Sequence, residues 1–332
     1  MLNDYKSLFN DNLFIDAIKA KKVCLFLGSG VGFNIGMPDW LGLAKKICAF
    51  CLKHKIINRS EQINLMNIKN PIKIISICTQ KIKNTEKIAQ FNNLLKTLFY
   101  DNPIKKYRTN KVYKNLSKLY KEKAVLIVQT NYDVMIEKFQ SKEEGENRKI
   151  YIPYLNEEAI PEKNILDFII YLHGRFSGDK TEFKHSSYED LVLDKEQYNK
   201  VYVLQDRIEF QKQKYFLNYL LKEFFIVFLG YSLSDTEILH MIANKQKTEQ
   251  YKQIAVIVDD CDAKKLENEF NANYLKMASN GKISTYVYET NECGIEHGFC
   301  EVIENLAQEI LTKPKTDNPI LRYTNPEEVD FG

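Results

Sequence analysis

VCLFLGSGVG, at residues 23–32, is a run of five apolar residues that leads into three closely spaced glycines. An unbroken apolar run predicts a strand buried on both faces, since a half-exposed strand alternates apolar and polar residues. Glycine carries no Cβ, so the backbone after the strand can turn sharply and approach another group closely. The stretch therefore predicts a buried strand that ends in a tight turn before a helix.

Similar short apolar runs recur along the chain, each closed by glycine or a polar residue and followed by helical periodicity. They are Ala124–Val128, Phe168–Leu172, Phe225–Leu229, Ile254–Val258 and Ile283–Tyr288. Buried strands that alternate with helices are typical of a parallel sheet covered on both faces. The predicted fold class is α/β, a doubly wound, Rossmann-like sheet with an inserted helical lobe.

The length of 332 residues suits one large domain with additional helices. We expect a single domain over residues 1–312, with helical-lobe segments at about 38–122 and 179–222. In the first segment the pattern predicts helices at about 38–54, 72–100 and 111–122. The second opens with a predicted capping box at 186–189 and continues as one long amphipathic helix. Residues 313–332 contain three prolines and predict an extended C-terminal arm.

Charge and cysteine content restrict the classes of ligand and compartment. Lys+Arg 47 against Asp+Glu 44 gives a net charge of +3, and only six basic residues are Arg. This argues against direct nucleic-acid binding, in which Arg commonly reads phosphates and bases. The seven Cys are an odd number and several lie in apolar runs, which favours reduced, packed thiols. With no apolar run long enough to span a bilayer, we expect a cytoplasmic protein without a membrane partner.

Small or polar residues follow four of the predicted strands. They form the glycine loop at 28–32, the Gln129–Asp133 segment, His173-Gly174, and Gly230–Asp235. In doubly wound sheets ligands bind beyond the carboxyl ends of the strands, so these loops are expected to converge on one cleft. The glycine loop by itself is a weak signal, because its spacing departs from G-x-G-x-x-G and a plain tight turn would explain it.

In order and spacing, the glycine loop with Gly36-Met37-Pro38-Asp39, the Gln129–Asp133 segment, Leu172-His173-Gly174 and Gly230–Leu233 resemble the NAD-binding motifs of the sirtuin superfamily. The resemblance covers roughly residues 20–260. In detail the chain is most similar to the bacterial sirtuin-like NAD hydrolases of antiphage defence, through its Asn-Tyr-Asp loop, its Gly-Tyr-Ser-Leu-Ser-Asp strand end and segment 187–198. The resemblance implies NAD as substrate.

The sequence also departs from the protein deacylases of that superfamily. Those enzymes carry a four-cysteine zinc module after the catalytic histidine, but residues 174–229 contain no Cys, so no zinc site is expected. Cys48 and Cys51 have C-x₂-C spacing without a second pair, and helix packing explains them better than metal binding. Leu41 stands where deacylases usually carry Arg. These differences argue against acyl-lysine as the substrate.

The resemblance assigns catalysis to Asn131, His173 and Asp133. The Asn131 amide can hold a ribose hydroxyl or water and turn its oxygen toward positive charge. The His173 imidazole can accept a proton from water or a ribose hydroxyl. Two roles stay open for Asp133, orientation of this network and an N-cap for a helix that starts near Val134. His173 could likewise be a satisfied polar residue at a strand end.

The expected NAD-binding residues come from the same loops. They are Gly28, Ser29, Gly30, Asp39, Thr130, Gly230, Ser232 and Asp235. Ser29, Ser232 and Asp235 are expected to contact ribose or phosphate. Ser234 with Glu237 could simply cap the next helix, and Asp259 with Asp260 is the weakest candidate pair.

Three functions fit these residues. The first is hydrolysis of NAD to nicotinamide and ADP-ribose by an NAD-depleting effector of antiphage defence. The second is NAD-dependent deacylation, and the third is sensing of NAD or an ADP-ribose-like signal without turnover. Unchecked NAD loss would kill the host, so the first function implies a resting state. That state would be relieved by a homo-oligomer or by a separately encoded sensor, such as a translocase-type ATPase or an Argonaute-like protein.

Overall fold

The computed structural model describes residues 3–140, 149–156, 162–177, 187–231, 238, 254–259, 283–289 and 295–313. Within these residues one parallel sheet has the strand order β1-β8-β7-β6-β2-β3-β5-β4. The strands are β1 (Asn3–Asp4), β2 (Val23–Leu27), β3 (Leu126–Gln129), β4 (Lys149–Tyr151), β5 (Phe168–Tyr171), β6 (Phe225–Leu229), β7 (Ile254–Asp259) and β8 (Ile283–Tyr288). The predicted α/β, Rossmann-like class is confirmed.

The glycine stretch forms the centre of the sheet. β2 pairs with β6 on one side and with β3 on the other, and Leu27 is in register with both Leu229 and Gln129. All five β2 residues are buried, as the unbroken apolar run predicted. The glycine loop therefore leaves the middle of the carboxyl edge, where neighbouring strand ends can reach it.

The six predicted strands are all present, with small shifts at their ends. β3 begins at Leu126 and extends to Gln129, while β5 ends at Tyr171. Sequence reasoning missed β1 and β4, which have two and three residues and lie at the two edges of the sheet. Strands this short and partly exposed give no apolar run to detect.

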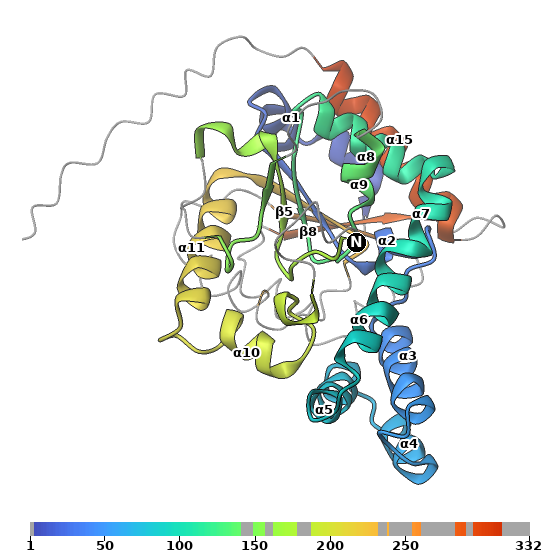
Figure 1. Ribbon diagram of the computed structural model, residues 1–332. Coiled ribbons are helices and arrows are strands. Elements are labelled where there is room, and N and C mark those ends of the chain that lie inside the picture. Colours follow the sequence, from blue (N-terminus) through green and yellow to red (C-terminus); the bar gives the residue numbers. More distant parts are fainter. Residues whose placement is uncertain are drawn as a thin grey trace, which may run out of the picture.

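Helices cover both faces of the sheet. α11 (Ile208–Glu223) contacts β6, and it lies on the side opposite α8 (Lys111–Lys121) and α15 (Ile295–Thr312) in Figure 1. α8 packs against α15 and against α9 (Met135–Gln140), and α1 (Asn12–Lys19) contacts β2 and β6. Short helical segments complete the connections: Tyr5–Asn10, α2 (Ser29–Phe33), Thr97–Asp101, α7 (Pro103–Lys106), Tyr107–Thr109, Glu162–Asp167 and Tyr188–Asp190.

A group of four helices extends away from the sheet at the lower right of Figure 1. It consists of α3 (Trp40–Lys53), α4 (Arg59–Met66), α5 (Pro71–Lys83) and α6 (Ile88–Lys96). Cys48 and Cys51 on α3 are fully buried, as is Cys78 on α5, and the Cys51 thiol lies 4.0 Å from the Cys78 carbonyl oxygen. The packing explanation for the C-x₂-C pair therefore fits the structure.

The helices of the two predicted lobe segments are more divided than expected. The predicted helix at 72–100 is two helices, α5 and α6, because the chain turns at 84–87. The predicted long helix after 186 is also two, α10 (Lys195–Tyr202) and α11. α10 contacts α5, whereas α11 contacts the sheet. The capping box is formed by Ser187 and Asp190 around a single 3₁₀ turn, one residue later than predicted.

The C-terminal part of the chain is described only to Lys313. The predicted arm at 313–332 therefore lies almost wholly outside the described residues. No helix in the described part of the chain is both long and apolar enough to cross a membrane.

Candidate functional site

The loops after β2 and β6 interlock through their backbones. The N–H of Gly28 donates to the Leu229 carbonyl, and the N–H of Gly30 donates to the Gly230 carbonyl, both at 2.9 Å. A Cβ at Gly28 would lie 2.4 Å from the Gly230 oxygen, and one at Gly230 would lie 2.7 Å from the Val31 nitrogen. Gly230 also has a φ of +58°, which disfavours other residues.

These contacts change the interpretation of the glycine motif. The N–H groups of Gly28 and Gly30 are engaged within the protein. Glycine has no side chain, so two loops that are distant in the sequence can touch here. This close approach is a structural reason for the glycines at these positions. A contact of these glycines with pyrophosphate stays a prediction.

Asn131 ties a third loop to this interlock. Its side-chain Nδ2 donates to the Gly28 carbonyl at 2.9 Å, and the side chain is almost fully buried. Just before it, the Thr130 N–H donates to the Leu27 carbonyl at 3.1 Å. The ends of β2, β3 and β6 therefore meet at one place, as the convergence of polar strand ends predicted.

His173 follows β5, the next strand in the sheet. The Leu172 N–H donates to the Gln129 carbonyl at 2.9 Å, which continues the β3–β5 register beyond the strand ends. His173 therefore lies at the same sheet edge as Asn131. Its imidazole is 2% exposed and packs edge to face against the Tyr202 ring, with centroids 5.6 Å apart and an interplanar angle of 87°.

Asp133 is fully buried and caps α9. Its Oδ1 accepts the Met135 N–H at 3.0 Å, and its Oδ2 accepts the Tyr113 hydroxyl at 3.2 Å. Burial raises the pKa of this carboxyl from 3.8 to about 6, because the charged form loses hydration. These contacts match the N-cap role that was left open. The Asp133 side chain does not line the cavity at this edge of the sheet.

A cavity opens at this edge of the sheet, next to the four-helix group. The space between its walls, including the part that is open to solvent, is about 380 Å³. Its lining consists of Ser29, Met37, Pro38, Asp39, Trp40, Leu43, Phe99, Thr130, Asn131 and Tyr132. Four predicted site residues, Ser29, Asp39, Thr130 and Asn131, are thus brought together. His173 is not among the lining residues.

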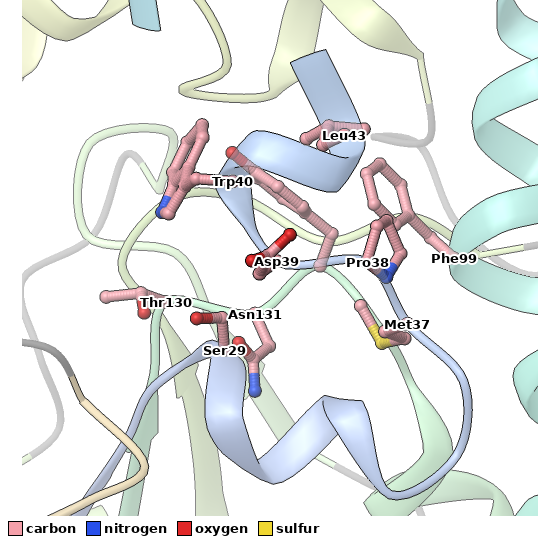
Figure 2. Close-up of a pocket in the computed structure, with 10 residues that line it drawn as sticks. Ser29, Met37, Pro38, Asp39, Trp40, Leu43, Phe99, Thr130 and Asn131 are labelled. Carbon is pink, nitrogen blue, oxygen red and sulfur yellow. The ribbon is translucent and has the colours of Figure 1, made fainter. Parts of the chain in front are cut away.

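Figure 2 shows how these side chains lie. Asp39 is positioned between Trp40 and Pro38, above Ser29, Thr130 and Asn131, and the Asn131 amide nitrogen points toward α2. The Asp39 Oδ1 accepts the Gly42 N–H at 2.6 Å, so this carboxylate also caps α3. The cap explains why α3 begins at Trp40 and why Trp40 lies at the wall of the cavity.

The apolar wall of the cavity was missed by sequence reasoning. Leu43 and Phe99 come from separate segments, and nothing in their local sequence marks them as cavity residues, whereas Met37 belongs to the Gly36-Met37-Pro38-Asp39 motif. Trp40 is the only tryptophan in the sequence and follows Asp39 directly, which is a signal that could have been used.

A buried ion pair next to His173 was also missed. Arg175 donates from Nη2 to Glu137 Oε2 at 2.6 Å and from Nε to Glu137 Oε1 at 3.2 Å, and both side chains are 2–3% exposed. The Tyr171 hydroxyl donates to the same carboxylate. This bidentate pair ties the loop after β5 to α9. An Arg two residues after His173, in a chain with six Arg, was an available signal.

The remaining predicted positions are only partly described. Ser232, Ser234, Asp235, Glu237 and Asp260 lie outside the described residues. Asp259 ends β7 and is 8% exposed, and it does not line the cavity. Among the described residues no group of three or more His, Cys, Asp or Glu side chains could hold a metal ion.

Comparison with known families identifies part of the chain. Residues 125–278 match the SIR2-like domain. The match covers a little under half of the chain and supports a place in the sirtuin-like superfamily. It includes Asn131 and His173, while the glycine loop of β2 precedes it. SIR2-like domains bind NAD, so the match indicates an NAD-related function. A comparison with curated proteins finds no match.

Proposed function

We propose that this protein hydrolyses NAD at the bond between nicotinamide and ribose, releasing nicotinamide and ADP-ribose. The proposal is carried by one observation. Within the SIR2-like segment, Asn131 lines a cavity at the carboxyl edge of the sheet, and His173 lies at the adjoining strand end.

The reaction places modest demands on the protein. As the bond breaks, the nicotinamide nitrogen takes the bonding electrons and leaves as a neutral base. No general acid is needed, in contrast to ordinary glycosidases. The ribose carbon becomes positively charged, and the oxygen of a water forms the new bond while the water loses a proton. The site must therefore stabilise positive charge and accept one proton.

Asn131 is suited to the first demand. Its amide nitrogen is held by the Gly28 carbonyl, and we propose that its side-chain oxygen is the atom that acts in the cavity. A carbonyl oxygen fixed beforehand in a mostly apolar cavity stabilises developing positive charge without reorganising. Ser29, Asp39 and Thr130 are the neighbouring polar groups that would bind ribose hydroxyls.

His173 is the proposed proton acceptor. Its position at the end of β5, next to Asn131 at the end of β3, places an imidazole within the same group of loops. Asp133 is the proposed positioning residue behind them, through its contacts with Tyr113 and α9. Ser232 and Asp235 are proposed to contact ribose or phosphate.

Hydrolysis is favoured over deacylation by two features of the sequence. Residues 174–229 contain no Cys, where the resembling deacylases carry their zinc module, and Leu41 replaces the usual Arg. Leu41 is 43% exposed and follows Trp40 of the cavity wall. By the same resemblance, we propose a cytoplasmic, NAD-depleting effector of antiphage defence. Its homo-oligomer or a separately encoded activator would release activity.

Chromatography of nicotinamide tests the proposal. Purified protein is incubated with NAD over a range of protein concentrations, alone and with an acylated peptide. Asn131→Ala should lower the rate of release about 10²–10³-fold and His173→Ala about 10²–10⁴-fold. Asn93→Ala on the exposed face of α6 and His54→Ala at the end of α3 should leave it unchanged. Cellular NAD is measured in parallel in cells that express the chain with its neighbouring genes.

Each alternative has its own outcome. NAD consumption that requires the acylated peptide would indicate a deacylase. Calorimetric binding of NAD without turnover, both in vitro and in cells, would indicate a sensor. Either result would overturn the hydrolase proposal, as would equal release by the Asn131→Ala and His173→Ala variants.

A further inference from the structure

We propose that Tyr202, held in place by Gln213, is a positioning residue that fixes the orientation of the His173 imidazole. The inference rests on the proposed function, because it assigns a task to His173. Tyr202 is the last residue of α10, and Gln213 lies on α11. Neither helix contains a residue that lines the cavity.

The backbone on both sides of His173 is held. The Leu172 carbonyl, which precedes His173, accepts the Tyr202 hydroxyl at 3.4 Å and the Gln213 Nε2 at 3.3 Å. The His173 carbonyl accepts the Val192 N–H at 2.9 Å. With both peptide groups fixed, the orientation of the His173 side chain depends on the contacts of its ring, among them those with α10.

Two tyrosines of α10 pack against that ring. Tyr202 meets it edge to face at 5.6 Å, and Tyr198 lies at 6.3 Å. The two tyrosines also contact each other, with centroids 4.8 Å apart, because they are four residues apart on one face of the helix. The hydroxyl of Tyr202 is fixed in turn by Gln213 Nε2 at 2.8 Å. One side chain therefore contacts both the ring of His173 and the carbonyl before it.

The polar side chain of Gln213 is unusual on a buried, otherwise apolar helix face. Gln213 is fully buried on the face of α11 that also carries Phe216, Leu217 and Leu220. Its Oε1 has no hydrogen-bond partner among the described residues. A buried, unpaired amide oxygen lowers stability relative to an apolar side chain of the same size. The amide is therefore poorly explained by folding, and its Nε2 contacts with Tyr202 and Leu172 supply the reason.

Burial keeps the Tyr202 hydroxyl protonated. The pKa of Tyr202 is raised well above 10, chiefly because its hydroxyl is removed from water. The hydroxyl therefore stays a donor to the Leu172 carbonyl throughout the neutral range.

A double-mutant cycle tests whether Tyr202 acts through His173. Tyr202→Phe removes only the hydroxyl, and Gln213→Met removes only the amide. Each variant is expected to lower kcat for NAD cleavage about tenfold and to leave KM nearly unchanged. A well-placed general base contributes about 10²–10⁴-fold to the rate, and a misoriented His173 would lose part of that contribution. In a His173→Ala background the same changes should have no further effect. An equal loss in that background would overturn the proposal.

Tyr120→Phe is the matched control. Tyr120 is also buried, and its hydroxyl donates to a backbone carbonyl, that of Asp167, at 2.7 Å. It lies on α8, on the other side of the sheet from α11. The control should show the ordinary cost of removing a buried tyrosine hydroxyl, read from thermal unfolding, with kcat unchanged.

A measurement without NAD separates this proposal from the proposed function. The nitrogen chemical shifts of the His173 ring, recorded by NMR on the full chain, report its tautomer and surroundings. They should change in Tyr202→Phe and Gln213→Met but not in Tyr120→Phe. Unchanged shifts in both test variants would refute the positioning role. If the wild type cleaves no NAD, the hydrolase proposal fails, and the shifts still decide the role of Tyr202.

Discussion

Asn131 and His173 occupy neighbouring strand ends, yet their surroundings differ. Asn131 lines the cavity and is tied to the glycine loop of β2. His173 is covered by the tyrosines of α10, and its loop is anchored to α9 through Arg175 and Glu137. Sheet topology thus brings the two residues to one edge, whereas the helices that cover the edge decide which side chain faces the cavity.

The largest expected effect lies on the His173 side. Arg175→Met should lower the free energy of unfolding by about 3–5 kcal/mol, because it leaves Glu137 charged and buried without its partner. Chemical denaturation measures the loss. The double variant Arg175→Met/Glu137→Gln should recover part of it. A loss below 1 kcal/mol would show that the loop after β5 is held by other contacts.

On the Asn131 side the main effect should be catalytic. Asn131→Ala is expected to reduce NAD cleavage by about 10²–10³-fold, the usual consequence of removing one preorganised dipole. Asn131→Asp keeps the shape and adds a charge, but it loses the donor to the Gly28 carbonyl. Rates from nicotinamide release, with thermal unfolding as the control for folding, check the prediction. An Asn131→Ala variant that retains wild-type kcat would contradict the role of the amide.

The interlock of the loops can be broken directly. Gly230→Ala should destabilise the fold by about 1–3 kcal/mol, because alanine is strained at a φ of +58° and its Cβ would meet the Val31 backbone. The cavity should be disturbed together with the fold. Gly298→Ala offers a comparison at a close contact that does not line the cavity, against the Glu289 carbonyl and Tyr288. Equal unfolding temperatures for Gly230→Ala and the wild type would argue against the interlock.

The smallest effect is a change in pH dependence. Burial raises the pKa of Asp133 from its ordinary 3.8 to about 6 in the folded protein, so the folded state binds the proton more tightly than the unfolded chain does. Its contribution to stability is therefore fully present below pH 4 and is lost as pH rises toward 6, with a slope of about 1 kcal/mol per pH unit. Asp133→Asn keeps the cap on α9 and should remove this slope. Unfolding measured from pH 4 to 7 tests it, and identical slopes would show that Asp133 titrates normally.

The sequence alone was sufficient to predict the central strands of the sheet and the convergence of the loops that follow them. Apolar runs such as Val23–Leu27 report burial on both faces, and parallel strands place their carboxyl ends together. The same reasoning predicted that Ser29, Thr130 and Asn131 lie close together, and in the structure all three line one cavity. Edge strands of two or three residues carry too little pattern to detect.

The orientation of side chains was beyond sequence reasoning. Whether His173 faces the cavity or α10 depends on the packing of Tyr198 and Tyr202, and on a turn at 203–207 that divides one predicted helix into two. The glycines were recognised, but their backbone partner lies about 200 residues away in the loop after β6. Such a partner cannot be inferred from local sequence, because a close approach between distant loops depends on the whole fold.

The central place of β2 has a consequence for biosynthesis. Its glycine loop is completed only by the strand that ends at Leu229, so a growing polypeptide cannot assemble the cavity until that strand has left the ribosome. Pairing across such a long interval is also slow to form. A half-made chain would therefore lack the completed glycine loop, and translation itself would set the earliest time at which the site can form.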